Sequence, residues 1–244
     1  MERLAFDLHL HSCLSPCGGE DNTPANLAGM CALAGIGVAA LTDHNTCGNC
    51  AAFCKAAEHY GLLALPGMEL TTAEEAHVVC LFPSLEGAEA FGALVREKLP
   101  PIPNNPAVFG PQIYMDEEDH ILGEETAFLA GACSIGIYEV QALVRSFGGV
   151  AWPAHIDRPS FSLLANLGLW DPAMGFSVAE ISKNCSPGLF DRPDLRGVPH
   201  FDGSDAHYLD QIADAHQYLY VPERSPEAVL NWFRAGCPKE DHFP

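Results

Sequence analysis

Short apolar segments alternate along the chain with segments of helical composition, and this order constrains the fold more than any other sequence feature. Turn and cap residues, such as Thr23-Pro24 and Gly61, separate the segments. The expected strands are 4–9, 36–42, 62–70, 77–82, 148–155, 176–182, 199–207 and 216–222. The expected helices are 23–34, 49–60, 86–98, 134–147 (capped by Ser134) and 225–235. This alternation predicts an α/β fold of parallel strands connected by helices.

One segment, from about 100 to 135, interrupts the alternation. Its proline-rich start, "LPPIPNNP", breaks regular structure, and "PQIYMDEEDHILGEE" has strand-like flanks around an acidic turn. We expect a small hairpin inserted into the main fold rather than part of it. With 48% apolar residues, the 244-residue chain can bury a large core, so we expect one domain, 1–244, with this insertion.

Imidazole and carboxylate groups recur at the edges of the expected strands. In a β/α barrel the strand ends converge on one face, so these groups would meet there although they are spread over 200 residues. They are His9, His11, Asp43, His44, Glu69, His77, His155, Asp205 and His207.

The shared chemistry of these residues is metal binding. Side chains at i and i+2 of a strand point to the same side, so His9 and His11 can hold one cation, as can Asp205 with His207. One such pair is a weak signal, but about six of the eleven histidines lie at strand edges. Imidazole favours Zn, Fe or Mn over Mg or Ca alone. The remaining histidines are expected in solvent: His59, His120, His200, His216 and His242.

The net charge of the chain limits the classes of partner that it is expected to bind. Twelve Lys and Arg against 32 Asp and Glu give a net charge of −20, which repels nucleic-acid duplexes and anionic membranes. A small phosphorylated substrate remains compatible, because bound cations reverse the local sign of a cleft. No apolar run approaches the roughly 18 residues of a membrane span, so we expect a cytoplasmic protein. The oligomeric state is not readable from the sequence.

The ten cysteines are expected to be reduced, with Cys31, Cys80 and Cys133 as buried thiols. Cys47, Cys50 and Cys54 leave open an iron–sulfur or redox role. Because a cubane cluster normally needs four cysteines, an incidental grouping is the favoured interpretation.

Six motifs together resemble the PHP (polymerase and histidinol phosphatase) family of metal-dependent phosphoesterases. In chain order they are "DLHLHS", "LTDHN", "PGMEL", "HVVCLF", "PAHID" and "GSDAH". The resemblance covers nearly the whole chain. It implies a distorted (β/α)7 TIM-like barrel that holds two to three divalent metal ions, of Zn, Fe or Mn type.

The resemblance also implies how the ligands divide. The first metal would be held by His9, His11, Glu69 and Asp205, and the second by Glu69, His77 and His155. The third would use His44, His207 and a residue shortly after the first motif. That position falls on Cys17, where many members have histidine or aspartate. A thiolate can bind Zn or Fe, so Cys17 is the expected ligand, with Asp21 or a weak third site as alternatives.

The implied activity is hydrolysis of a small phosphomonoester by metal-activated water, without a side-chain nucleophile. Arg158 is expected to contact the phosphate, because it follows His155 closely and a guanidinium can bind two phosphate oxygens. A surface ion pair is the alternative for Arg158, and Arg192 and Arg196 are weaker candidates. Asp43 is expected to orient a water or a ligand histidine.

Two other functions stay open. An amidohydrolase-type enzyme would also begin with HxH and cut C–N or C–O bonds, with Lys183 as the candidate for a carboxylated bridging lysine. A non-catalytic PHP-type binding module would show lost ligands, whereas eight of the expected positions keep their residue type.

Overall fold

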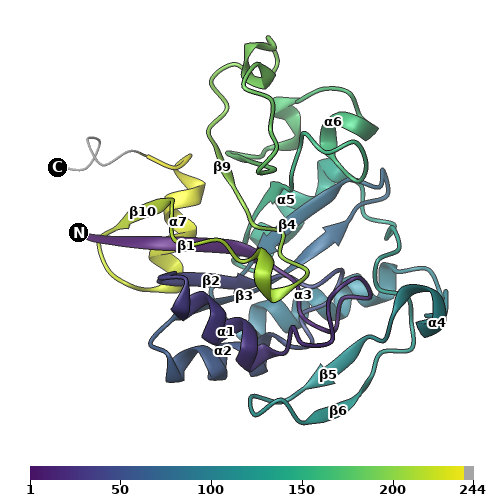
Figure 1. Cartoon of the computed structure of the whole chain (residues 1–244). Helices are drawn as coiled ribbons and strands as arrows, with labels where there is room; N and C mark the ends of the chain where they lie inside the picture. The colour runs from purple at the N-terminus through teal and green to yellow at the C-terminus, as the bar shows by residue number, and fades with distance from the viewer. Residues whose placement is uncertain (239–244) are drawn as a thin grey trace.

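The computed structural model describes residues 1–238, and its central feature is a curled six-stranded sheet with the order β10-β1-β2-β3-β4-β7 (Figure 1). The strands are β1 (Glu2–Leu10), β2 (Val38–Leu41), β3 (Leu63–Thr71), β4 (His77–Leu81), β7 (Val150–Pro153) and β10 (Tyr218–Val221). A separate parallel pair, β8 (Ala179–Ile181) and β9 (His200–Asp202), extends the curl. The result is a mixed α/β half-barrel, which confirms the expected distorted TIM-like class.

The sheet is mixed rather than wholly parallel, so the expectation of parallel strands throughout is wrong. β1, β2 and β3 are parallel neighbours, whereas β4 runs antiparallel to both β3 and β7, and β10 runs antiparallel to β1. The short connection 72–76 explains the reversal at β4, because a parallel crossover needs a dozen or more residues. As a consequence, the start of β4 lies at the same edge as the ends of β1 and β3.

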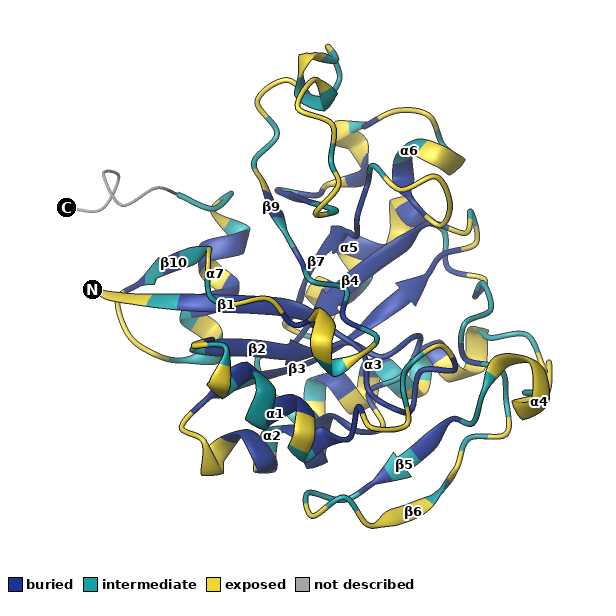
Figure 2. Ribbon diagram, viewed as in Figure 1, coloured by how far each residue is buried: buried dark blue, intermediate teal, exposed yellow. Residues whose placement is uncertain are grey.

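Helices bury both faces of the sheet. The outer helices α1 (Pro24–Leu33), α2 (Cys50–His59), α3 (Leu85–Lys98) and α5 (Ile137–Ser146) pack in one apolar cluster, whereas α7 (Pro226–Arg234) packs on the opposite face around Trp152 and Phe233. Both faces of the inner strands are therefore buried, as Figure 2 shows. This explains the continuous apolar runs in the sequence.

Helix starts follow the caps that the sequence indicates, with one exception. Thr23 and Ser225 each accept a hydrogen bond from a first-turn backbone amide, and a proline follows each cap. Ser134 does not cap α5 as expected. The helix begins three residues later, where the Glu139 side chain accepts from the amide of Gly136, while the amide of Ser134 donates to the carbonyl of Lys98.

The insertion contains the expected hairpin. β5 (Ile113–Met115) and β6 (Ile121–Glu124) pair antiparallel in a sheet of their own, after the short helix α4 (Pro106–Phe109). Figure 1 shows the hairpin standing beside the main sheet. Contacts from Cys13 and Asn49 to Ile113 and Met115 attach β5 to the loop after β1 and the start of α2. The remaining short helices are α6 (Leu163–Asn166) and the 3-10 turns Pro172–Met174, Leu189–Asp191 and Leu209–Gln211.

Two predicted strand ends are loops in the structure. β7 ends at Pro153, before His155, and β9 ends at Asp202, before Asp205 and His207. His155 and Asp205 both have left-handed backbones, with φ of +29° and +49°. Such backbones in non-glycine residues cost energy and concentrate at functional sites.

Candidate metal centre

Eight of the nine predicted ligands gather at one edge of the half-barrel. β1 contributes His9 and leads into His11, β3 contributes Glu69, and β4 begins with His77. Loops after strands contribute the other four: His44, His155, Asp205 and His207. Cys17 lies at the rim of this assembly and is exposed.

The first group contains His9, His11, Glu69 and Asp205, whose ligand atoms all lie within 4.8 Å of one another. His9 Nε2 is 3.2 Å from Glu69 Oε1 and 3.4 Å from Asp205 Oδ1. His11 Nε2 lies 3.4 Å from Glu69 Oε2 and 3.3 Å from Asp205 Oδ1. Two imidazoles and two carboxylates thus face one point, in the combination expected for the first metal.

Glu69 also joins the first group to a second. His77 Nδ1 is 2.9 Å and His155 Nε2 is 3.1 Å from Glu69 Oε1, and His44 Nδ1 is 3.0 Å from Oε2. The mutually close set here is His44, Glu69 and His77. His44 therefore lies nearer to the second group than the sequence indicated. Glu69 is fully buried and lies within reach of every one of these imidazoles.

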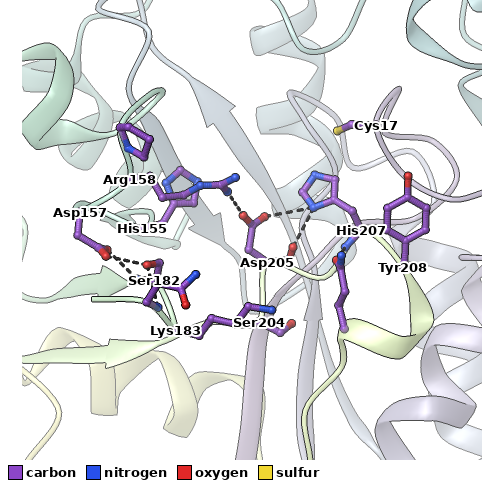
Figure 3. A pocket seen from close by; sticks show the side chains of 14 residues that line it. Cys17, His155, Asp157, Arg158, Ser182, Lys183, Ser204, Asp205, His207 and Tyr208 are labelled. Carbon is purple, nitrogen blue, oxygen red and sulfur yellow. Dashed lines mark hydrogen bonds and ion pairs between the residues drawn. The ribbon is translucent and has the colours of Figure 1, made fainter. Parts of the chain in front are cut away.

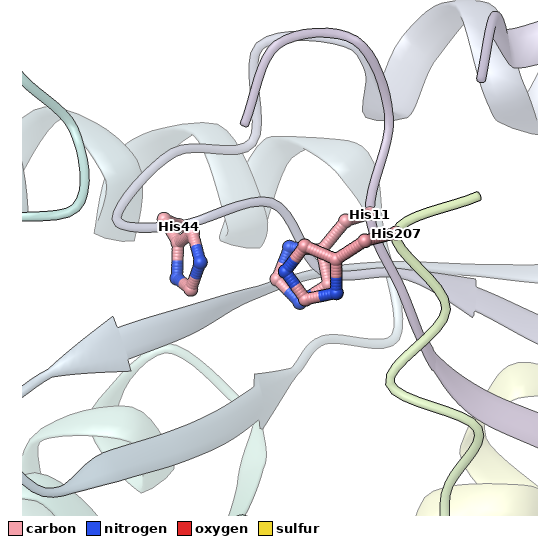
Figure 4. Close-up of side chains that lie close together, drawn as sticks. All are labelled: His11, His44 and His207. Carbon is pink, nitrogen blue, oxygen red and sulfur yellow. The ribbon is translucent and has the colours of Figure 1, made fainter. Parts of the chain in front are cut away.

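A third group consists of His11, His44 and His207 (Figure 4). The rings of His11 and His207 stack with centroids 4.2 Å apart. Cys17 is outside this compact set, but it lines the same cavity as His207. The structure thus places Cys17 beside the third group and not among its closest atoms.

Hydrogen-bond partners orient the rings of three histidines. The Ser15 hydroxyl donates to Asp43 Oδ1 at 2.6 Å, so it accepts from Nδ1–H of His11 at 2.9 Å. Glu180 Oε1 accepts from Nδ1 of His9 at 2.7 Å, and the Asp205 carbonyl accepts from Nδ1 of His207 at 2.8 Å. In each ring it is therefore Nε2 that would serve as the donor atom toward a cation at the centre.

Asp43 lies in the loop after β2 and contacts the loop after β1, which carries His11. It is buried and accepts from the Ser12 amide at 2.7 Å, the Ser12 hydroxyl at 2.6 Å and the Ser15 hydroxyl. Its reach to a ligand histidine is indirect, through Ser15 to His11. Through these contacts the Asp43 carboxylate is hydrogen-bonded to the loop after β1.

The donor atoms at the centre are better suited to binding cations than to forming hydrogen bonds with one another. One buried atom on each of seven predicted ligands has no partner with hydrogen-bond geometry within residues 1–238. They are His9 Nε2, His11 Nε2, His44 Nδ1, Glu69 Oε2, His77 Nδ1, His155 Nδ1 and Asp205 Oδ1. Buried polar atoms are normally paired, and divalent cations are the usual partner of such convergent imidazole and carboxylate donors.

The protonation behaviour shows how strongly these groups interact. Burial lowers the pKa of His11, but Asp205 and Glu69 outweigh it and raise the pKa to about 9. At His77 burial prevails and lowers the pKa to about 4. Burial would raise the pKa of Glu69, yet the surrounding imidazoles, those of His77 and His9 first, hold it well below its usual range. Glu69 therefore stays an anion at the middle of the site.

A cavity of about 690 Å³ opens beside the centre (Figure 3). His155, Asp205 and His207 form its inner end, and the outer walls carry mostly polar side chains. The outer residues include Cys17, Asp157, Arg158, Ser182, Lys183, Asn184, Tyr208 and Gln211. Arg158 forms an ion pair with Asp205 Oδ2, so the ion pair considered from sequence exists, but its partner is a predicted metal ligand.

A match to a protein-family model shows which family the chain belongs to. The PHP domain model matches residues 7–135, which is more than half of the 244 residues. The chain belongs to the PHP family of metal-dependent phosphoesterases. No curated protein sequence matches the chain significantly.

Solved structures show how widely this PHP fold is shared. The lesion-specific endonuclease PfuEndoQ from Pyrococcus furiosus is similar with a TM-score of 0.69 and 15% identity over 96% of this chain and 56% of its own. The present chain therefore spans a little over half of that endonuclease.

Two other similar structures are matched over most of their own length. A candidate metal-dependent phosphoesterase from Bifidobacterium adolescentis has a TM-score of 0.60 and 19% identity, over 98% of this chain and 99% of its own. An amidohydrolase from Chromobacterium violaceum has a TM-score of 0.57 and 19% identity, over 95% and 96%. At these identities the likenesses establish the PHP fold.

The other candidate residues lie outside the PHP centre. Arg192 binds Asp194 and the carbonyl of Gly168, while Arg196 and Asp21 are exposed and do not line the cavity. Lys183 lines the cavity wall, and Glu69 occupies the bridging place that a carboxylated lysine would need. The histidines expected in solvent and described by the structure, His59, His120, His200 and His216, are exposed, and His242 lies outside the described residues.

The cysteine group near α2 has a packing role in this PHP chain. Cys47 and Cys50 are buried, and both thiols donate to the carbonyl of Gly67, at 3.2 and 3.3 Å. Contact with the Cys47 thiol and burial raise the pKa of Cys50 well above its usual value. The Cys50 thiol therefore stays protonated, which is unlike a cluster ligand. All ten cysteines are free.

Sequence reasoning missed Glu180 and Ser15, which hold His9 and His11 from behind. A signal for Glu180 existed, because it is a single acid inside the apolar strand "FSVAEIS". An acid at such a position is buried and needs a partner. No comparable signal marked Ser15 in its polar loop.

No helix among residues 1–238 is long and apolar enough to cross a membrane.

Proposed function

We propose that this PHP-family chain hydrolyses a small phosphomonoester with water, using two to three divalent cations of the Zn, Fe or Mn type. The observation that carries the proposal is the position of Glu69, a buried carboxylate within 3.4 Å of five imidazoles. One oxygen of Glu69 faces His9, His77 and His155, and the other faces His11 and His44. Such a carboxylate is suited to bridge two cations.

The residues would divide among three positions. His9, His11, Glu69 and Asp205 would hold the first cation, and Glu69, His77 and His155 the second, with His44 close by. His44, His207 and Cys17 would hold the third, where His11 also lies near. Bound cations would supply hydroxide at neutral pH and neutralise charge on the phosphoryl group.

The chain itself positions the phosphate. Arg158 lines the cavity and pairs with Asp205, so its guanidinium can donate to two phosphate oxygens beside the centre. Ser15 and Glu180 keep Nδ1–H of His11 and His9 turned away from the centre. Preorganised donors of this kind need little rearrangement during the reaction.

The leaving group would occupy the outer cavity. A volume of about 690 Å³ exceeds what a phosphate needs and is typical of pockets for whole small molecules. The polar side chains that line it, among them Lys183, Asn184 and Gln211, favour a hydrophilic leaving group. Nucleotides, sugar phosphates and amino-alcohol phosphates all have this character.

Duplex nucleic acid is not part of the proposal. The endonuclease similarity concerns a protein of which this chain matches 56%, and a net charge of −20 opposes a phosphate backbone. Cleavage of a lesion-containing duplex is the outcome that would revise this expectation.

The test combines metal analysis with a substrate panel. Elemental analysis of freshly purified protein is expected to find two to three equivalents of transition metal, and phosphate release is expected from one class of phosphomonoester. Amides and lactones form a second arm for the amidohydrolase alternative. Turnover of that arm alone, or a protein without stoichiometric metal, would contradict the proposal.

A further inference from the structure

Glu180 is a buried carboxylate in β8, with 1% of its surface exposed. Its flanking residues, Ala179 and Ile181, pack in an apolar cluster. A carboxylate in such surroundings is costly unless hydrogen bonds compensate it. Its partners therefore show what it does.

The three donors to this carboxylate lie on β1, on β7 and in the loop after β7. His9 Nδ1 is 2.7 Å from Oε1, the His155 amide is 3.3 Å from Oε1, and Trp152 Nε1 is 3.3 Å from Oε2. The backbone carbonyl of Glu180 also accepts from the Ile156 amide at 2.9 Å. Glu180 thus contacts the ring of one predicted ligand and brackets the left-handed backbone of another, His155.

A third ligand-bearing segment packs directly on the carboxylate. A Cβ added at Gly203 would lie 2.8 Å from the Glu180 carboxyl carbon and 2.9 and 3.0 Å from its oxygens. Only glycine fits this approach without moving the carboxylate. Two residues later the same segment presents Asp205 to the first group. This contact gives the glycine of "GSDAH" a physical reason, although its backbone does not adopt a left-handed conformation.

We propose that Glu180 is a positioning residue for the metal centre, and that Gly203 is glycine because Glu180 must stay against His9. The carboxylate fixes Nδ1–H of His9, so Nε2 faces Glu69 and Asp205. It also holds the backbone of His155 in place. Through these contacts one side chain aligns the segments that carry ligands of the first and second positions. The inference rests on the proposed metal centre, not on any substrate.

The test measures metal affinity rather than turnover. Glu180→Gln keeps the size of the side chain but removes its charge. Gly203→Ala leaves Glu180 in the sequence but displaces its carboxylate. Partners behind a ligand histidine typically contribute about 10- to 100-fold in metal affinity. We expect both variants to lose the first cation at about 10- to 100-fold lower chelator concentration than wild type, and to change the visible spectrum of the Co²⁺-loaded protein.

A matched control is available in the insertion. Glu125 is a largely buried carboxylate that accepts from Arg96, Tyr114 and the Ala127 amide, and it contacts no predicted ligand. Glu125→Gln should leave chelator resistance and the Co²⁺ spectrum unchanged, even where its melting temperature falls. If Glu180 has only a structural role, Glu180→Gln should likewise leave chelator resistance and the Co²⁺ spectrum unchanged.

The outcomes separate the inference from the function beneath it. If wild type retains stoichiometric metal and both variants retain it equally tightly, the inference is wrong while the metal centre stands. If wild type itself binds no cation, the proposed function fails and the inference fails with it. Weakened binding in both variants, with an unchanged melting temperature of the chelator-treated protein, supports the positioning role.

Discussion

The two sides of the metal centre are built differently. On one side His9, Glu69 and His77 belong to strands of the sheet and are fully or nearly buried. On the other side Cys17, Asp205 and His207 belong to loops, and the side chains of Asp205 and His207 remain 14% and 19% exposed. The strand side has a fixed frame, whereas the loop side faces the cavity (Figure 3).

This difference indicates a division of labour. Strand-borne ligands are fixed by ladder hydrogen bonds, and His9 is also held by Glu180 behind it. Loop-borne ligands line the cavity where the substrate would bind and have fewer such supports. We therefore expect cations shared with Glu69 to be retained most firmly, and the third cation, beside Cys17, to exchange most easily.

The largest effect is expected where the two sides meet, at Asp205. Asp205→Ala removes the loop-borne carboxylate of the first position and leaves Arg158 without its ion-pair partner. Metal retention at that position and hydrolysis should both be abolished, as elemental analysis and phosphate release would show.

The matched control for this prediction is Asp202→Ala. Asp202 lies at the end of β9 and pairs with His216, and it belongs to none of the three metal groups. It should retain metal and activity. An Asp205→Ala variant with full activity would refute the assignment of the first site.

A smaller effect is expected at Arg158, which lies on the loop side but is not a ligand. Arg158→Ala should lower turnover by about 100-fold or more, the usual cost of losing one donor to transition-state charge, while metal content is unchanged. Arg158→Lys should recover part of the loss, because it keeps the charge without the two-pronged geometry. The exposed Arg196 provides the control, since Arg196→Ala should have no effect. If all of these variants have wild-type activity, Arg158 forms only a surface ion pair and does not contribute to phosphate binding.

A still smaller effect is expected at Cys17, where the comparison predicts selective loss of one cation. Cys17→Ser replaces a thiolate donor with a weak neutral one, so metal content should fall from about three to about two equivalents. The firmly held cations and most of the turnover should remain. Cys185→Ser, at a half-buried cysteine outside the metal groups, is the control. If the metal content of Cys17→Ser equals that of wild type, then another residue supplies the third-site ligand or the third site is unfilled in both proteins.

The sequence predicted the members of the centre better than their local structure. The sequence predicts Asp205 and His207 on one face of a strand, holding one cation together, but both lie in a loop after β9 and join different groups, Asp205 the first and His207 the third. The spacing of "SDAH" indicated metal chemistry, but φ of +49° at Asp205 depends on tertiary contacts that no local pattern records. The bridge between Leu10 and Ala206 is one such contact.

His77 shows the opposite case. Its place at the start of a strand conflicts with the rule that sites in parallel barrels lie at strand ends, yet the resemblance to the PHP family included it. The conflict disappears because β4 runs antiparallel to β3, which brings its first residue to the end of β3. The sequence contains a signal for this reversal of strand direction, because the five-residue connection before β4 is too short for a crossover helix.

The smallest effect is expected at Lys183, which lines the cavity and belongs to none of the three metal groups. Lys183 has no ion-pair partner within residues 1–238, so its charge is available to an anionic or strongly polar part of the leaving group. An exposed charge contact contributes about 0.2–1 kcal/mol, which corresponds to a rise in KM of roughly 1.4-fold to 5-fold for Lys183→Ala. The value of kcat and the metal content should be unchanged, because Lys183 touches neither ligand nor metal group. Lys98→Ala, at an exposed lysine at the end of α3, should alter nothing. If Lys183→Ala lowers kcat instead of raising KM, the outer wall takes part in the chemical step, and the separation between the buried frame and the open cavity is less complete than the structure indicates.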